Sequence, residues 1–119
     1  FGLGTANALL DFFATWCPPC KPEMANLRAA RDRFDRGQVA IISITRETET
    51  AAIKSFWDEY DATWPVVMDP DLRSFRHFSV TAIPTILVRR PDGTVVRRHT
   101  GLMGEQAIIT AIETALDAT

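Results

Sequence analysis

The run Trp16-Cys17-Pro18-Pro19-Cys20 constrains this chain more than any other feature, because it holds the only two cysteines with two residues between them. Thiols at this spacing can form an intramolecular disulfide and reopen it, which is redox chemistry. A purely structural disulfide is one alternative, but so small a loop would stabilise the fold by only about 2 kcal/mol. Structural zinc is another, yet His77 and His99 lie far along the chain from the cysteines and from each other. We therefore interpret the pair as redox-active.

The cysteine motif joins a predicted strand to a predicted helix. Residues 8–13 are a short apolar run typical of a buried strand. Pro18 and Pro19 suit the first turn of a helix, where amide donors have no partner. We expect this helix to extend to about Asp35, to be kinked at Pro22 and to be ended by Gly37.

The rest of the chain alternates between strand and helix patterns. Strand, helix and strand at the start imply a parallel pair, whereas the turn residues Pro91-Asp92-Gly93 predict an antiparallel hairpin. We therefore expect one α/β domain over residues 1–119, a mixed central sheet with helices on both faces. The further predicted elements are a strand over 39–44, a helix containing Ile53, Phe56, Trp57 and Tyr60, a short strand over 65–68, a short helix with Asp69 as N-cap and Pro70 as its first residue, hairpin strands over 85–88 and 94–96, and a last helix over 104–116.

Composition and charge limit the classes of protein and of partner to be considered. A hydrophobic fraction of 46% and a charged fraction of 24% are ordinary for a globular chain. The net charge of −2 argues against a nucleic-acid surface. No apolar run reaches the length of a membrane span. The chain begins at Phe1 rather than methionine, so we expect a fragment or processed product, and an N-terminal signal or anchor stays an open alternative.

The two cysteines are predicted to have different roles. A thiol at a helix start is stabilised as thiolate by the positive end of the helix dipole, so Cys17 is the expected nucleophile. Cys20, one turn further in and less exposed, is expected to resolve the mixed disulfide. Pro18 and Pro19 have no amide hydrogen to offer the Cys17 sulfur, and neither is a histidine that could add positive charge. The reduced form therefore gains little stabilisation, which favours a reductant.

Two carboxylates are candidates for proton transfer. Asp11 stands within the apolar strand, six residues before Cys17, where desolvation would raise its pKa and let it take the proton of Cys20. The alternative is an aspartate that reaches solvent at the end of the sheet. Glu23 lies three residues beyond Cys20 on the same predicted helix and is a second relay candidate, although exposed glutamates are common on helices.

Ile83-Pro84 precedes the strand predicted over 85–88. Proline at this position can simply mark the start of the strand, with no further role. A cis bond would instead turn the backbone of Ile83 toward the cysteines and offer an edge to an extended peptide. Trp16 is either a core residue or an apolar docking surface beside the nucleophile.

These residues resemble a known family. The run from Asp11 to Met24, together with Ile83-Pro84-Thr85, is similar to the thioredoxin superfamily and specifically to its TlpA/ResA-like branch. The resemblance covers nearly the whole chain. Residues 48–68 lie where that branch carries an insertion absent from plain thioredoxins, and the run 69–71 before the short helix is also typical of it.

The resemblance implies a thioredoxin fold, Cys17 as the attacking thiol, Cys20 as the resolving thiol and a cis bond before Pro84. Glu23 matches an acidic residue near the active site of ResA-like members. Together with Asp11, for which the residues themselves argue, these form the predicted catalytic set. The resemblance places Trp16, Ile83 and Gly101 around the substrate groove, with Pro84 between them. Members are mostly extracytoplasmic bacterial thiol:disulfide oxidoreductases, often held by an N-terminal anchor, that reduce apocytochromes c or copper-site assembly partners. One departure is Asp11, because many members of the branch carry asparagine there.

The first interpretation is therefore a protein disulfide reductase that cycles between dithiol and disulfide, needs no bound cofactor or metal, and receives electrons from an upstream thiol donor. We expect an extracytoplasmic monomer, with the cytoplasm as the alternative location. The alternative function is a copper-handling or binding module that uses the cysteines as ligands, because soft thiolates with a nearby histidine suit copper. A peroxidase is less favoured, since no thiol stands in a threonine- and proline-rich context.

Overall fold

The computed structural model describes residues 6–117, which build one five-stranded mixed sheet in the order β3-β2-β1-β4-β5. The central strand β1 pairs in parallel with β2 and antiparallel with β4. Strand β3 adds in parallel to β2, and β5 closes the hairpin with β4. The strands are β1 (Asn7–Phe12), β2 (Val39–Thr45), β3 (Val66–Met68), β4 (Thr85–Arg89) and β5 (Val95–Thr100).

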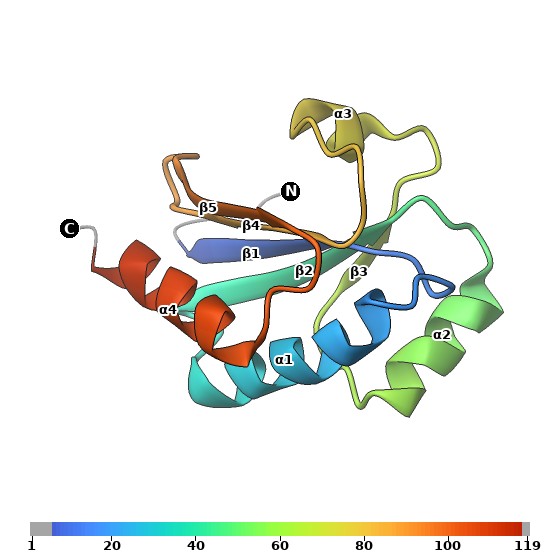
Figure 1. The fold of residues 1–119 in the computed structure, drawn as a ribbon, viewed down its shortest axis with the longest axis horizontal. Coiled ribbons are helices and arrows are strands. Elements are labelled where there is room, and N and C mark those ends of the chain that lie inside the picture. Colours follow the sequence, from blue (N-terminus) through green and yellow to red (C-terminus); the bar gives the residue numbers. More distant parts are fainter. Residues whose placement is uncertain (1–5, 118–119) are drawn as a thin grey trace.

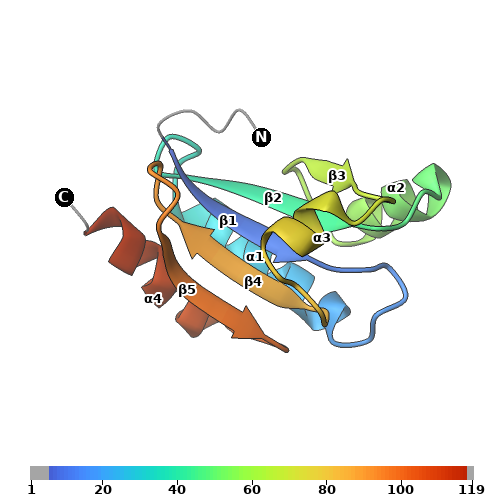
Figure 2. The same cartoon turned by 90° about the horizontal axis from the view of Figure 1, so that it is seen from above.

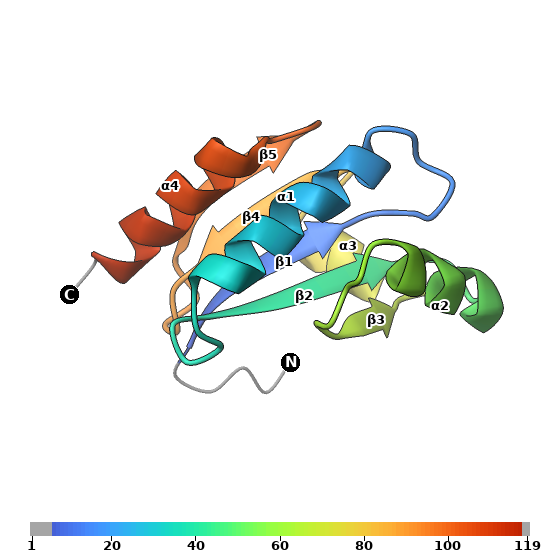
Figure 3. The same cartoon turned by 90° about the horizontal axis from the view of Figure 1, so that it is seen from below.

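Within residues 6–117, four helices cover both faces of this sheet, as the sequence predicts. Three of them, α1, α2 and α4, lie on one face, and α3 lies alone on the other (Figure 1, Figure 2). Figure 3 shows α1 crossing the middle of the sheet beside α4, with α2 toward the β3 edge. The helices are α1 (Cys20–Arg33), α2 (Thr50–Glu59), α3 (Arg73–His77) and α4 (Glu105–Leu116).

Each face of the sheet has its own hydrophobic core, because β1 is buried on both sides and successive side chains point to opposite faces. Leu9 and Phe13 belong to the core under α1, α2 and α4, which also contains both cysteines. Leu10 and Phe12 belong to the core under α3. Asp11 alternates with Phe12 and so lies on the cysteine side. No helix within residues 6–117 is long and apolar enough to cross a membrane.

The catalytic helix begins later than predicted. Helix α1 starts at Cys20 rather than at Pro18, because the two prolines form the preceding turn, in which the Cys20 amide donates to the Cys17 carbonyl at 3.1 Å. Cys17 therefore precedes the helix by three residues. Pro22 becomes the third helical residue, where its missing amide hydrogen has no partner to lose, so the reason for the predicted kink disappears. The helix ends at Arg33, ahead of the predicted end at Asp35.

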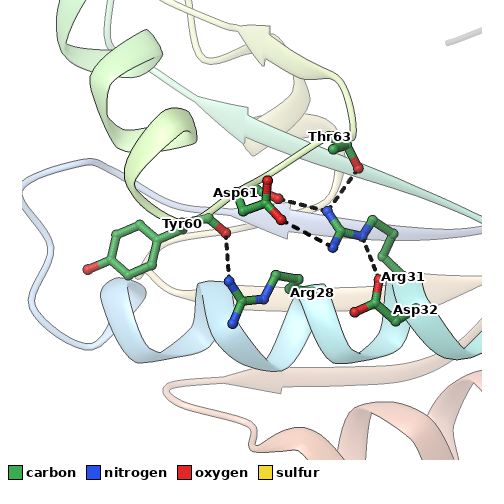
Figure 4. Close-up of polar contacts among 6 residues, drawn as sticks. All are labelled: Arg28, Arg31, Asp32, Tyr60, Asp61 and Thr63. Atoms are coloured by element: carbon green, nitrogen blue, oxygen red, sulfur yellow. Dashed lines mark hydrogen bonds and ion pairs between the residues drawn. The ribbon is translucent and has the colours of Figure 1, made fainter.

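Two arginines of α1 hold the segment between α2 and β3 (Figure 4). The Arg31 guanidinium donates to the Asp61 carbonyl at 2.7 Å and to the Thr63 hydroxyl at 3.0 Å. Arg28 reaches the Tyr60 carbonyl at 3.5 Å. The segment over residues 48–68, predicted as an insertion, is thus fastened to the helix that carries Cys20.

The start of α3 also differs from the prediction. The helix begins at Arg73, four residues after Asp69, so Pro70 lies in a turn rather than at the first helical position. The Asp69 carboxylate nevertheless accepts the backbone amides of Arg73, Ser74 and Phe75 at 3.0, 2.9 and 3.4 Å. Asp69 therefore satisfies the amides at the start of the helix from a more distant position than an N-cap.

We expect Asp69→Ala to lower the free energy of unfolding by about 1–2 kcal/mol, because three amides at the start of α3 lose their acceptor. Urea denaturation followed by circular dichroism measures the change. Asp71→Ala is the matched control, since Asp71 is exposed and accepts none of these amides. Equal effects of the two substitutions would contradict the capping role.

Candidate active site

Cys17 and Cys20 form a disulfide at the N-terminal end of α1. Both belong to the hydrophobic core that contains Met24, Leu27 and Met103. Cys17 is 3% exposed and Cys20 is 1% exposed, so the expected exposure of Cys17 is not found in this disulfide-bonded form. The reason is local: the Cys17 amide donates to the Ala14 carbonyl at 3.2 Å, which folds the loop back over the core.

Asp11 is buried on the face of the sheet that packs under α1, which rules out the solvent-facing alternative. Its Oδ2 accepts a hydrogen bond from the Ser43 hydroxyl at 2.7 Å, and that hydroxyl accepts one from the Trp64 indole at 2.9 Å. Asp11 and Ser43 are directly opposite each other in the parallel register of β1 and β2. The carboxylate is therefore held by one hydroxyl in an otherwise apolar layer.

Burial raises the pKa of Asp11 from 3.8 to about 7, because desolvation disfavours its charged form. The negative charge of Glu23 raises this pKa further, whereas the hydrogen bond from Ser43 lowers it. A carboxyl group with a pKa near neutrality can both take up and release a proton at physiological pH.

Glu23 is 1% exposed, so the alternative of an exposed helical glutamate is ruled out. Its Oε1 accepts the backbone amide of Met103 at 2.8 Å, and its Oε2 accepts the Asn26 side-chain amide at 2.8 Å. Glu23 thus joins α1 to the loop before α4. Its buried carboxylate also lies close enough to influence the titration of Asp11.

The peptide bond between Ile83 and Pro84 is cis, as predicted. Pro84 is buried, and its carbonyl accepts the amide of Gly101 at 2.7 Å. Gly101 has a φ of 96°, a conformation that favours glycine. The structure therefore brings together the two loops in which the sequence placed groove residues.

Trp16 is 64% exposed, so it is a surface residue rather than part of the core. It lines one cleft together with Ile83. Within residues 6–117, the backbone amide and carbonyl of Ile83 take part in no hydrogen bond. An apolar surface and an unpaired backbone edge thus lie side by side next to the cysteine loop.

Sequence reasoning missed three polar residues around the site: Ser43, Trp64 and Glu47. The signal for Ser43 was its position as a polar residue within the apolar strand 39–44, like Asp11 in its own strand. Glu47 accepts the Thr15 amide at 2.8 Å and also the Thr15 hydroxyl at 2.6 Å, which ties the loop before Trp16 to the end of β2. No sequence pattern indicated that contact.

The histidines are separate from the cysteines. His77 is exposed on α3, and His99 contacts the Leu102 carbonyl at 3.1 Å. In the part of the chain that the structure describes, no three side chains of His, Cys, Asp or Glu come together as a ligand group for a metal ion.

A mixed sheet in this order, a Cys-x-x-Cys disulfide at the start of the first helix and a cis-proline before the antiparallel hairpin define a protein of the thioredoxin fold. The model of the AhpC/TSA family matches residues 3–98. The chain belongs to this family, and the predicted membership in the thioredoxin superfamily is confirmed.

The curated relatives support the ResA-like branch. The thiol-disulfide oxidoreductase ResA of Bacillus subtilis is 32% identical over 102 residues, which are 86% of this chain and 57% of that protein. ResA of Halalkalibacterium halodurans is 29% identical over 102 residues, 86% of this chain and 58% of that protein. The chain therefore spans somewhat more than half the length of these relatives.

Solved structures support the fold. StoA from Bacillus subtilis superimposes with a TM-score of 0.80 at 21% identity, covering 91% of this chain and 83% of that one. StoA and the first of the two ResA proteins both come from Bacillus subtilis.

Proposed function

We propose that this chain is a thiol:disulfide oxidoreductase that reduces disulfides in partner proteins. The observation that carries the proposal is the Cys17–Cys20 disulfide at the start of α1, in a core cluster against which Ile83 packs. The similarity to proteins named thiol-disulfide oxidoreductase supports the same chemistry. Reduction rather than oxidation is favoured because Pro18 and Pro19 offer no amide hydrogen to the Cys17 sulfur.

In the proposed cycle, the Cys17 thiolate attacks one sulfur of the partner's disulfide. A Cys17–partner disulfide forms, and the other partner sulfur leaves as a thiolate and is protonated. Cys20 then loses its proton and attacks the Cys17 sulfur, which releases the second partner thiol and leaves the Cys17–Cys20 disulfide. The partner gains two electrons and two protons, and an upstream thiol donor returns the chain to the dithiol form.

Asp11 is the proposed acceptor of the Cys20 proton. It is buried on the cysteine side of the sheet, and its pKa of about 7 suits proton transfer near neutral pH. Glu23 is proposed to tune the pKa of Asp11, as a smaller influence than burial, because two hydrogen bonds hold its buried side chain in place. Trp16, Ile83, Pro84 and Gly101 form the proposed surface for the partner's backbone.

We further propose an extracytoplasmic monomer tethered through an N-terminal segment, with the cytoplasm as the alternative. A relative from Mycobacterium tuberculosis is described as secreted and as homologous to the Escherichia coli protein DsbE; it superimposes with a TM-score of 0.79 at 24% identity over 94% of this chain and 84% of that one. Reduction of apocytochromes c or of copper-site assembly partners is the proposed pathway role. Neither role requires a bound cofactor.

Reduction of insulin by the dithiol form, followed as turbidity, tests the function. Titration of the same dithiol form with Cu(I) tests the alternative copper-handling role. Rapid insulin reduction with weak copper binding supports the proposal. Tight stoichiometric copper binding without insulin reduction would replace it with the copper-handling alternative.

We expect the Cys17–Cys20 pair to have a reduction potential at or below about −230 mV, because positions 18 and 19 supply neither an amide donor nor a positive charge to the Cys17 thiolate. Equilibration in glutathione buffers, with the two redox forms separated after alkylation, measures this value. Pro19→His is the informative variant and should raise the potential. A potential near −180 mV, typical of disulfide isomerases, would contradict the argument from missing donors.

A further inference from the structure

A cleft of about 340 Å³ lies beside the cysteine loop, between Trp16 and α3. Its apolar surface comes from four parts of the chain: the residue after β1, the cysteine loop, α3 with the residue before it, and the loop before the cis-proline. Phe75 and Val80, which belong to the core under α3, form part of this surface. The apolar lining consists of Phe13, Trp16, Leu72, Phe75, Val80, Ala82 and Ile83.

Two arginines also line this cleft, Arg46 from the end of β2 and Arg76 from α3. Both are exposed, and within residues 6–117 neither guanidinium forms an ion pair or a hydrogen bond. No acidic residue lines the cleft. The cleft is therefore a positively charged site on a chain whose net charge is −2.

Within residues 6–117, the carboxylates of Glu47 and Asp69 form no ion pair with these arginines. Glu47 directs both oxygens to Thr15 and to the Thr45 hydroxyl. Asp69 directs both oxygens to the amides at the start of α3. The two guanidinium groups thus remain available for an external anion.

Ile83, whose backbone takes part in no hydrogen bond within residues 6–117, lines this cleft together with Trp16, the residue before Cys17. An extended peptide that pairs with Ile83 would place alternate side chains on opposite sides of its backbone. One set of these side chains would lie over the cleft that Trp16 and Ile83 line. The residues flanking the reacting cysteine of a partner would therefore contact both the apolar lining and the arginines.

We infer that this cleft selects partner proteins in which the disulfide is flanked by an apolar and an acidic side chain. The inference rests on the proposed function and adds a substrate class to it. The apolar side chain packs on Phe75 and Val80, and the carboxylate binds Arg46 and Arg76. Complementary charges of this kind chiefly set specificity and the rate of association.

Two peptide disulfides test the inference, identical except that the residues flanking one cysteine are leucine and glutamate in the first and leucine and lysine in the second. We expect the dithiol form to reduce the glutamate peptide with a kcat/KM about tenfold higher, mainly through KM, and the preference to fall as salt is raised. Arg46→Gln combined with Arg76→Gln should bring the ratio close to one. Arg76→Glu should invert it.

The matched control is Arg73→Gln, which removes the same charge from an exposed residue of α3 that does not line the cleft. It should leave the preference intact. All variants should reduce hydroxyethyl disulfide, a small uncharged substrate, at the unmodified rate. Equal kcat/KM for the two peptides, or a preference that persists in the double variant, overturns the inference and leaves the proposed function standing.

A binding measurement separates failure of the inference from failure of the function. Peptides with serine in place of cysteine cannot react, and their binding is followed by Trp16 fluorescence, with Trp16→Phe correcting for Trp57 and Trp64. Tighter binding of the glutamate peptide, lost in the double arginine variant, supports the cleft whatever the redox activity. If that binding occurs but neither disulfide peptide is reduced, the proposed function is wrong. Equal binding of both peptides overturns the cleft assignment.

Discussion

Cys17→Ser is expected to abolish the reduction of protein disulfides, with a loss of at least about 10³-fold, because the serine hydroxyl cannot replace the attacking thiolate. Cys20→Ser is expected to be equally inactive in turnover but to accumulate a covalent complex with the partner, since the second sulfur is needed to release it. Mass spectrometry of the unreduced reaction mixture measures that complex.

The attacking cysteine can be assigned from these two variants, because the chain contains no other cysteine. Any covalent complex in the Cys20→Ser variant must therefore run through Cys17. The Cys17→Ser variant is the matched control and should trap little partner. A stronger complex with Cys17→Ser than with Cys20→Ser would exchange the two roles, an outcome worth testing because burial of the disulfide form does not distinguish the two residues.

The second large effect is expected at Asp11. Asp11→Asn should raise the free energy of unfolding of the oxidised chain by about 3–4 kcal/mol at pH 8, because the folded chain then no longer holds a desolvated carboxylate. Asparagine can still accept the Ser43 hydroxyl through its side-chain oxygen. The same change should slow release of the partner from the mixed disulfide, since Cys20 loses its proton acceptor.

The pH dependence of this gain has a definite sign. The folded pKa of Asp11 is raised to about 7 from 3.8, so protonation favours the folded chain. The stabilising effect of the protonated carboxyl is fully present below pH 3.8 and is lost as the pH rises to about 7. Asp11→Asn should therefore gain little at pH 4 and most at pH 8.

Denaturation at both pH values measures the gain. Asp71→Asn, at an exposed position, is the matched control and should change stability little at either pH. A gain for Asp11→Asn that is the same at pH 4 and pH 8 would show that the carboxyl does not titrate in this range. Unchanged partner release would remove Asp11 from the proton path.

The sequence predicted β1 to β4 to within one residue at each end because their signals are local, but β5, expected over 94–96, extends from Val95 to Thr100 because its polar second half lacks an apolar strand pattern. Apolar runs indicated β1 and β2, and Pro91-Asp92-Gly93 marked the turn between β4 and β5. The first residues of the helices were predicted less accurately. Pro18 and Pro19 fit a turn as well as they fit the first turn of a helix, and Asp69 can reach amides four to six residues away, so neither signal determines the first helical residue.

Site residues whose type itself indicates the chemistry were predicted from the sequence. Contacts that depend on the tertiary structure were not. The cysteines, Asp11 and the cis bond before Pro84 could be identified from the sequence. The contact between Glu23 and Met103 joins residues 80 positions apart, and the Thr15–Glu47 contact joins residues 32 apart. Such partners become visible only once the packing of the helices and the register of the strands are known.

Because both cysteines lie in the hydrophobic core, the oxidation state of the pair and the stability of the fold are linked through a thermodynamic cycle. The difference in unfolding free energy between the oxidised and reduced chains equals the difference in reduction potential between the folded and unfolded pair, at about 1.4 kcal/mol for 30 mV. A folded pair more reducing than the unfolded one thus makes the disulfide form the more stable fold. A replacement of Met24 or Leu27, which are buried in the same core, that destabilises one redox form more than the other would then change the reduction potential of the pair through packing alone.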